Sequence, residues 1–434
     1  MRGGGRPRAR GSSREKEEPT TPGVPVRRGE RRSLSHVGGA VDVGGDPRLS
    51  KLLAEALDVQ VSVATKGEGP DRAHVHGFHA YPARMHPVTA ARLVRTLSPA
   101  NALVLDPFCG SGTVLVEAMI AGRRSVGTDL NPLAVALAKL KTTGLDEAAR
   151  RRVVGAARIV AALADERRKA RAGATQRYPK EDVEVFEPHV LLELDSLRAG
   201  ITRTPDEKTR RALFLVLSAI LVKVSRKHGD TSEAVGPRRI SAGYTGKLFV
   251  KKAEELCLRL ADLARILPRG ATDARVEIDD ATRLSTVGPG SVDLVVTSPP
   301  YVGTYDYVAH HALRMRWLGF DATAFEGGEI GARRRYAPSP AFNPGLAWSK
   351  ELSAFLSAAR KVMKPGAPIV LLMADSAVGR QALRADVIVP AVAQETGFRS
   401  VARASQQRPH FHGATAAVFR SAPRAEHALL LERT

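Results

Sequence analysis

The chain has 434 residues, of which 43% are hydrophobic, and a formal net charge of +21. This length allows one large domain with an insertion, or two domains, around a buried core. The positive charge indicates a polyanionic partner, although an arginine-rich composition alone produces the same charge. No apolar run is long enough to span a bilayer, and two cysteines cannot form a disulfide framework, so we expect a cytoplasmic protein.

The N-terminal segment, residues 1–45, is rich in Arg, Gly, Pro and Ser and has no hydrophobic periodicity. It is predicted to be a disordered basic arm. A first α/β segment is predicted over residues 46–144, with a short helix at 49–57. Its later part reads as a strand, a glycine-rich turn, a helix, a second strand and a further helix, which is how a doubly wound sheet begins.

Residues 145–270 change to apolar positions at helical spacing, which predicts a helical insertion. The predicted helices of this insertion cover residues 146–170, 193–201, 205–226 and 247–266. The strand pattern resumes in residues 271–434. We therefore predict an α/β, doubly wound and mostly parallel sheet of seven strands, at residues 102–105, 124–128, 274–278, 292–297, 368–373, 398–404 and 427–431.

The glycine-rich turn, Asp106-Pro-Phe-Cys-Gly-Ser-Gly-Thr113, follows the first strand. Its glycines let the backbone approach a ligand closely, and ligands of open α/β sheets bind beyond the carboxyl ends of the strands. The turn has neither the dinucleotide fingerprint nor the lysine of a triphosphate-binding loop. Asp129, after the second strand, is placed to accept hydrogen bonds from the ribose of an adenosine, and Asp280 or its neighbour Asp279 is placed to meet the adenine.

The tetrapeptide Ser298-Pro299-Pro300-Tyr301 follows the fourth predicted strand. Two prolines there make a rigid extended tip, which directs the Ser298 hydroxyl and the Pro299 carbonyl to one point. Both groups accept hydrogen bonds, and an exocyclic amino group of a base offers two N–H donors. Tyr301 supplies a face on which a base can stack. We interpret this tip as a catalytic centre.

These motifs resemble those of the amino-group DNA methyltransferases, which modify cytosine N4 or adenine N6. Residues 106–113 resemble the cofactor motif of that family, residues 298–301 its catalytic motif, and residues 78–87 the segment that closes over the methionine part of S-adenosylmethionine. The resemblance implies the methyltransferase sheet, S-adenosylmethionine as cofactor, and double-stranded DNA with a flipped target base as substrate. A serine at the first catalytic position favours cytosine N4 over adenine N6.

Carried over residue by residue, the resemblance assigns catalysis to Ser298, Pro299, Pro300 and Tyr301. It assigns cofactor binding to Phe78, Tyr81, Asp106, Pro107, Phe108, Gly110, Gly112, Thr113, Asp129, Asn131 and Asp280. The helical insertion becomes the candidate DNA-recognition region, and the family context is restriction-modification, although the sequence identifies neither a partner restriction enzyme nor a recognised DNA site.

Four alternatives compete with this interpretation. Cytosine-C5 methylation needs a cysteine at the catalytic tip, and Tyr301 stands there. A metal site among the histidines of residues 74–86 lacks a carboxylate or cysteine at a known ligand spacing, so no metal is expected. An RNA base methyltransferase, such as a tRNA-modifying enzyme, and a catalytically inactive DNA-binding protein on the same scaffold remain open.

Overall fold

A computed structural model describes residues 40–59, 69–230, 234–336, 342–408 and 416–434. These residues belong to one unit of the chain, Leu34–Thr434. The other unit, Met1–Ser33, and the predicted basic arm up to residue 39 lie outside the described residues. No helix within the described ranges is both long and apolar enough to cross a membrane.

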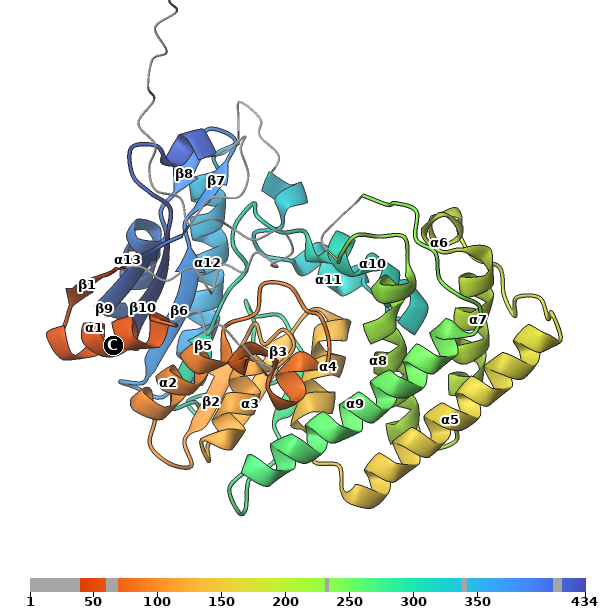
Figure 1. Cartoon of the computed structure of the whole chain (residues 1–434). Helices are drawn as coiled ribbons and strands as arrows, with labels where there is room; N and C mark the ends of the chain where they lie inside the picture. The colour runs from red at the N-terminus through yellow and green to blue at the C-terminus, as the bar shows by residue number, and fades with distance from the viewer. Residues whose placement is uncertain (1–39, 60–68, 231–233, 337–341, 409–415) are drawn as a thin grey trace, which may run out of the picture. The chain divides into compact units, whose positions relative to one another are not determined.

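An eight-stranded sheet forms the centre of the unit, in the order β1-β9-β10-β6-β5-β2-β3-β4 (Figure 1). Neighbouring strands from β6 to β4 are parallel, and β10 is antiparallel to both β6 and β9. The strands are β1 (Val41–Gly45), β2 (Leu103–Asp106), β3 (Arg124–Asp129), β4 (Arg275–Ile278), β5 (Leu294–Thr297), β6 (Pro368–Ala374), β9 (Phe398–Gln407) and β10 (Ala425–Arg433). The predicted α/β fold with a mostly parallel sheet is confirmed.

The seven predicted strands are all present, but β1 adds an eighth at the edge, antiparallel to β9. The prediction that the disordered arm extends to residue 45 is therefore wrong for Val41–Gly45. This strand is short and mostly exposed, so the backbone ladder to β9 rather than side-chain burial holds it, and its sequence carries little hydrophobic signal. A small hairpin of β7 (Ser376–Val378) and β8 (Gln381–Leu383) was also not predicted.

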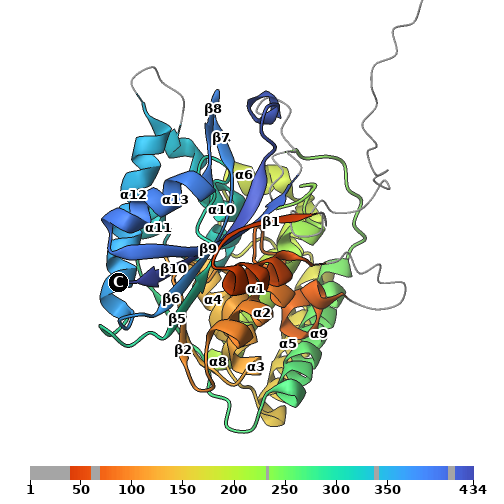
Figure 2. The same cartoon turned by 90° about the vertical axis from the view of Figure 1, so that its left-hand side faces the viewer.

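Helices cover both faces of the sheet, as Figure 2 shows from the side. On one face the apolar side chains of α1, α2 and α3 pack against Val104, Val370 and Leu372. On the other face α12 and α13 pack against Leu105 and Leu371. Successive residues of the central strands thus face opposite layers, which requires continuous apolar runs, and this is why the sequence identified these strands readily.

The helices of the described residues have the following bounds: α1 (Pro47–Leu57), α2 (Pro87–Leu97), α3 (Thr113–Ile120), α4 (Pro132–Thr142), α5 (Glu147–Lys169), α6 (Lys180–Val185), α7 (Pro188–Thr202), α8 (Glu207–Leu221), α9 (Tyr244–Ile266), α10 (Tyr307–Leu318), α11 (Thr323–Gly328), α12 (Pro344–Val362) and α13 (Ala385–Glu395). The four helices predicted in the insertion correspond to α5, α7, α8 and α9, with ends shifted by a few residues, and α6 was not predicted.

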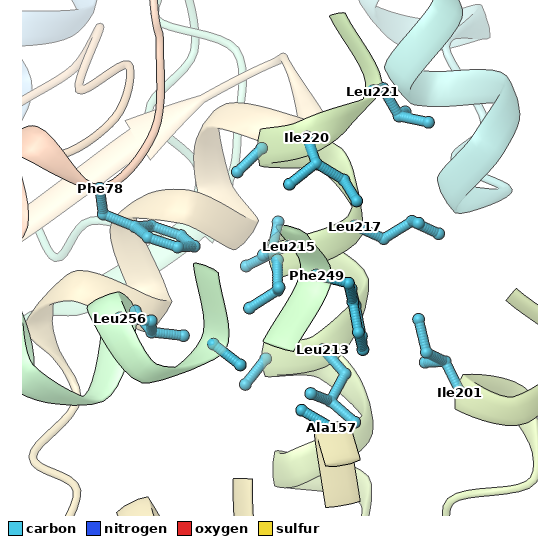
Figure 3. Close-up of a cluster of buried hydrophobic side chains, with 14 of the residues drawn as sticks. Phe78, Ala157, Ile201, Leu213, Leu215, Leu217, Ile220, Leu221, Phe249 and Leu256 are labelled. Carbon is cyan, nitrogen blue, oxygen red and sulfur yellow. The ribbon is translucent and has the colours of Figure 1, made fainter. Parts of the chain in front are cut away.

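The insertion has its own hydrophobic core, in which α5, α7, α8 and α9 pack together (Figure 3). Leu213, Leu217 and Phe249 have essentially no exposed surface, so this block is stabilised largely by its own buried side chains. Trp317 of α10 also belongs to this core, and the Arg314 side chain bonds to the Ser218 carbonyl and pairs with Asp230. The helix that follows the predicted catalytic tip is therefore anchored on the insertion.

Candidate active site

A cavity of ≈ 840 Å³, including space open to solvent, lies at the carboxyl ends of the parallel strands β2, β3, β4 and β5. It brings together most of the site residues predicted from the sequence. Those lining it are Tyr81, Asp106, Pro107, Phe108, Gly110, Thr113, Asp129, Asn131, Asp280, Ser298 and Pro300. Segments almost 200 residues apart in the chain therefore face one space.

The glycine-rich turn adopts the backbone geometry that its glycines allow. Gly110 and Gly112 both have positive φ, 49° and 84°, a conformation that side chains disfavour. A Cβ on Gly112 would also lie 3.1 Å from Ala138 of α4, and one on Gly110 would lie 3.2 Å from the Tyr81 ring. Gly112 does not line the cavity, so its role in the structure is close packing of the turn against α4.

Asp129 fastens the turn to the end of β3. Its Oδ2 accepts a hydrogen bond from the Gly110 amide at 2.9 Å, and its Oδ1 accepts one from the Asn131 amide at 2.8 Å. Burial raises the pKa of this carboxyl to about 6, because desolvation disfavours the charged form. Asp129 thus shapes the cavity as well as lining it.

Asp106, the last residue of β2, is hydrogen-bonded to the end of β5, the strand before the predicted catalytic tip. Its Oδ1 accepts hydrogen bonds from the Thr297 hydroxyl at 2.6 Å and from the Phe108 amide at 3.2 Å. Desolvation raises its pKa to about 7. The glycine-rich turn and the strand before the predicted catalytic tip are therefore held together by one buried carboxyl.

Tyr81 closes the cavity from the segment that precedes α2. The Asn131 amide nitrogen donates to its hydroxyl at 3.3 Å, and its ring stacks on His311 of α10 with centroids 4.9 Å apart. Phe78 does not line the cavity but lies in the core shared with the insertion, 1% exposed. The structure therefore gives Phe78 a packing position, and we do not retain it as a cofactor contact.

Both aspartates after β4 line the cavity. Asp279 accepts hydrogen bonds from the Thr286 amide and hydroxyl, each at 2.7 Å, and Asp280 accepts equivalent bonds from Thr282, each at 2.8 Å. Both bonds from Thr282 reach Asp280 Oδ1, so we expect Oδ2 to be the oxygen that meets a ligand.

The predicted catalytic tip is divided between the cavity and the protein interior. Ser298 and Pro300 line the cavity, whereas Pro299 and Tyr301 do not. Tyr301 is 8% exposed, and its hydroxyl donates to Glu426 Oε1 at 2.8 Å. Ser298 therefore faces the cavity, and its role as an acceptor and the stacking role of Tyr301 both stay predictions.

Two further residues that line the cavity, Tyr307 and Glu329, were not predicted from the sequence. Glu329 Oε1 accepts a hydrogen bond from the Tyr307 amide at 2.8 Å, and Glu329 also pairs with Arg334. Burial raises the pKa of Glu329. Neither residue belongs to a recognisable motif, so only the folding of the α11 segment against α10 reveals them.

The charge of the cavity wall is strongly one-sided. Arg84 is the one basic residue among the described residues that line it. The carboxyl groups that line the cavity are those of Asp106, Asp129, Asp279, Asp280 and Glu329. Such a wall attracts a ligand that carries positive charge and hydrogen-bond donors, and it repels a polyphosphate.

The histidines before α2 are engaged in structural contacts. His76 pairs with Glu117 of α3 at 2.8 Å, and His79 bonds to the Ser218 hydroxyl of α8 at 3.0 Å. His74, His76 and Glu117 do bring possible ligand atoms within 4.8 Å of one another. Arg259, whose Nη1 donates to the His74 carbonyl at 2.8 Å, places positive charge near this group, so we assign it no metal.

The fold and the cavity define an α/β protein whose ligand site lies at the carboxyl edge of a parallel sheet. Residues 54–140, which contain α2, the cofactor turn and Asp129, match the family model described as DNA methylase. This segment of the chain is thus similar to the DNA methylase family, and the resemblance predicted from the sequence is confirmed.

Two relatives agree with this match. The chain is 42% identical over 74 residues to the Type II methyltransferase M.MvaI of Kocuria varians, covering 16% of each chain. It is 31% identical over 90 residues to the Type II methyltransferase M.MjaII of Methanocaldococcus jannaschii, covering 21% of this chain and 17% of that protein. The chain therefore matches less than a fifth of the length of either relative.

Among solved structures, the chain aligns with TrmN from Thermus thermophilus at a TM-score of 0.31 and 12% identity, covering 81% of this chain and 50% of that one. It aligns with the rRNA methyltransferase aviRa from Streptomyces viridochromogenes at a TM-score of 0.31 and 14% identity, covering 82% of this chain and 88% of that one.

Proposed function

We propose that this protein transfers a methyl group from S-adenosylmethionine to the exocyclic amino group of a base in DNA. One observation carries the proposal: the methylase-family cofactor turn and the Ser298 tip line the same cavity. Cytosine N4 is favoured over adenine N6 as the target, because a serine at the first position of the catalytic motif, here Ser298, resembles the motif of the cytosine-N4 enzymes of that family.

The cavity wall fits the proposed cofactor. S-adenosylmethionine carries a sulfonium and an ammonium charge, and the carboxyl groups around the cavity complement both. Asp129 and Asp280 are placed at the ends of β3 and β4, where they would accept hydrogen bonds from the ribose and the adenine. The cofactor supplies an electrophilic methyl group, and these side chains determine how it is oriented.

At the catalytic tip, Ser298 and the Pro299 carbonyl would accept the two amino protons of the target base. These hydrogen bonds polarise the amino nitrogen and direct its lone pair toward the cofactor pocket. Alignment and electrostatic stabilisation of this kind lower the barrier to methyl transfer. The target amino group lies within a duplex, so the base must leave the stack to reach Ser298.

The helical insertion is the proposed DNA-recognition region. Its loop between α8 and α9 contains exposed Arg238 and Arg239, and the loop is tied to α10 by the Asp230–Arg314 ion pair. Since α10 begins six residues after Tyr301, contacts made by this loop would be transmitted directly to the catalytic segment.

The test is to incubate the purified chain with labelled S-adenosylmethionine and either duplex DNA or total RNA, and then to identify the methylated nucleoside by mass spectrometry. We expect N4-methylcytosine from DNA. N6-methyladenine would reverse the base preference, and label in RNA alone would favour the RNA alternative. Cofactor binding without transfer to either polymer would favour the inactive scaffold.

A further inference from the structure

The hairpin of β7 and β8 contacts the segment that follows the predicted catalytic tip. It begins directly after the carboxyl end of β6, the strand next to β5 in the sheet. The hydroxyl oxygens of Ser376 and Thr304 lie 3.4 Å apart, and a Cβ on Gly303 would lie 2.8 Å from Cγ2 of Val378. The hairpin therefore lies at the same edge of the sheet as the cavity.

The turn of this hairpin places an arginine at its apex. Val378 pairs with Gln381, so only Gly379 and Arg380 lie in the turn. Gly379 has a φ of 57°, which tight hairpin turns require and which glycine adopts without strain. Arg380 is exposed, and its side chain has no hydrogen bond or ion pair with any residue that the structure describes.

A second exposed arginine lies on the neighbouring segment, just after η6 (Ala417–Phe419). Arg384, which follows β8, places its guanidinium 5.1 Å from the centroid of the Phe419 ring and donates to the Pro423 carbonyl at 2.9 Å. These contacts hold the hairpin and the η6 segment together. Arg420 is exposed, and its side chain likewise has no partner within the described ranges.

We call residues 376–385 and 416–425 the hairpin surface. These two segments contain four arginines and no acidic residue. Arg384 donates to Asp375 Oδ2 and Arg424 donates to the Asp375 carbonyl, both at 2.8 Å. These two arginines therefore fix the hairpin surface to the end of β6, while Arg380 and Arg420 present their charge to solvent.

The hairpin surface and the helical insertion flank the cavity from opposite sides (Figure 1). The hairpin follows β6, whereas α4, which follows β3, packs into the core of the insertion through Leu133 and Leu137. In the sheet order β6-β5-β2-β3, the strands that end at the cavity lie between these two parts. A duplex whose target base reaches Ser298 would therefore meet Arg239 on one flank and the hairpin surface on the other.

We propose that the hairpin surface is a second DNA-binding surface, on which Arg380 and Arg420 each bind a backbone phosphate. A guanidinium group suits this role because it donates two parallel N–H bonds to phosphate oxygens. Phosphate contacts fix the orientation of a duplex without reading its sequence, so contacts on both flanks would hold the target base over Ser298. This inference rests on the proposed function and extends the DNA-binding region beyond the insertion.

The test measures the affinity of the full chain for a duplex oligonucleotide over a series of salt concentrations. Any duplex serves, because phosphate contacts are independent of sequence. Arg380→Glu and Arg420→Glu should each lower the slope of log affinity against log salt by about 1, and the double variant should lower it by about 2. Arg380→Lys keeps the charge and should keep the slope.

Arg269→Glu is the matched control. Arg269 is exposed and has no side-chain partner among the described residues, but it precedes β4 and so lies at the amino edge of the sheet, away from the cavity. It changes the net charge by the same amount as Arg380→Glu. An equal loss of slope in all three single variants would show a general charge effect and would overturn the inference, as would unchanged slopes in Arg380→Glu and Arg420→Glu.

Methyl transfer, measured on the same samples, separates this inference from the proposed function. If the wild type methylates DNA while both hairpin variants keep its salt slope, only the inference fails. If the slopes fall as expected but no methyl group is transferred to DNA, the proposed function fails and the DNA-binding surface stands. Binding of the wild type to RNA but not to duplex DNA would overturn both.

Discussion

Asp129 offers the sharpest test of the proposed cofactor site. Its carboxylate lines the cavity and also holds the glycine-rich turn that forms part of the same cavity wall. Asp129→Ala removes the acceptor for the Gly110 and Asn131 amides, which bond to it at 2.9 and 2.8 Å. Hydrogen bonds to a charged group contribute about 1.5–3 kcal/mol each. We expect the affinity for S-adenosylmethionine to fall by about 1.5–3 kcal/mol, or roughly 10- to 150-fold, with a further loss of folding stability.

Isothermal titration calorimetry with S-adenosylmethionine measures this change, and thermal unfolding measures the stability. Asp129→Asn should fall between the wild type and Asp129→Ala, since an amide keeps one acceptor and presents a donor to the other backbone N–H. Asp146→Ala is the matched control, because Asp146 accepts from the Ala149 amide at 2.7 Å at the start of α5, outside the cavity lining. It should cost about 1 kcal/mol of stability and leave cofactor affinity unchanged. Equal affinity in Asp129→Ala and the wild type would refute the reasoning.

Three further predictions concern charge and the catalytic tip. Because burial raises the pKa of Asp106 to about 7, binding of a cationic cofactor favours its ionised form, releases protons below that pH, and weakens as the pH is lowered from about 8 to about 6. Calorimetry in buffers of different ionisation enthalpy measures the released protons, and a pH-independent affinity contradicts the prediction. Ser298→Ala should lower the single-turnover rate about 100-fold with little change in DNA or cofactor binding, whereas Ser298→Asp restores an acceptor and should recover much of the rate. Arg239→Glu should reduce the slope of log affinity for DNA against log salt by about 1, and an unchanged slope would exclude this residue from phosphate contact.

The local sequence determined most of the fold and the two motifs. Strands that are buried on both faces need continuous apolar runs, and Leu103 to Leu105 or Leu294 to Val296 provide them in a few residues. The positive φ of Gly110 and Gly112 requires a residue without a side chain, so the turn was visible as a motif. The edge strand β1 was missed because its stability comes from the backbone ladder to β9, which leaves no periodic pattern.

Only the tertiary structure determined which residues complete the site. Glu329 and Glu426 are isolated acidic residues in the sequence, and each becomes significant when folding buries it beside Tyr307 or Tyr301. Phe78 lies within a motif, yet packing against the insertion places it in the core rather than in the cavity. Local motifs record what the backbone must do within a few residues, whereas burial and hydrogen-bond partners depend on strands and helices that meet from 22 to 125 positions away.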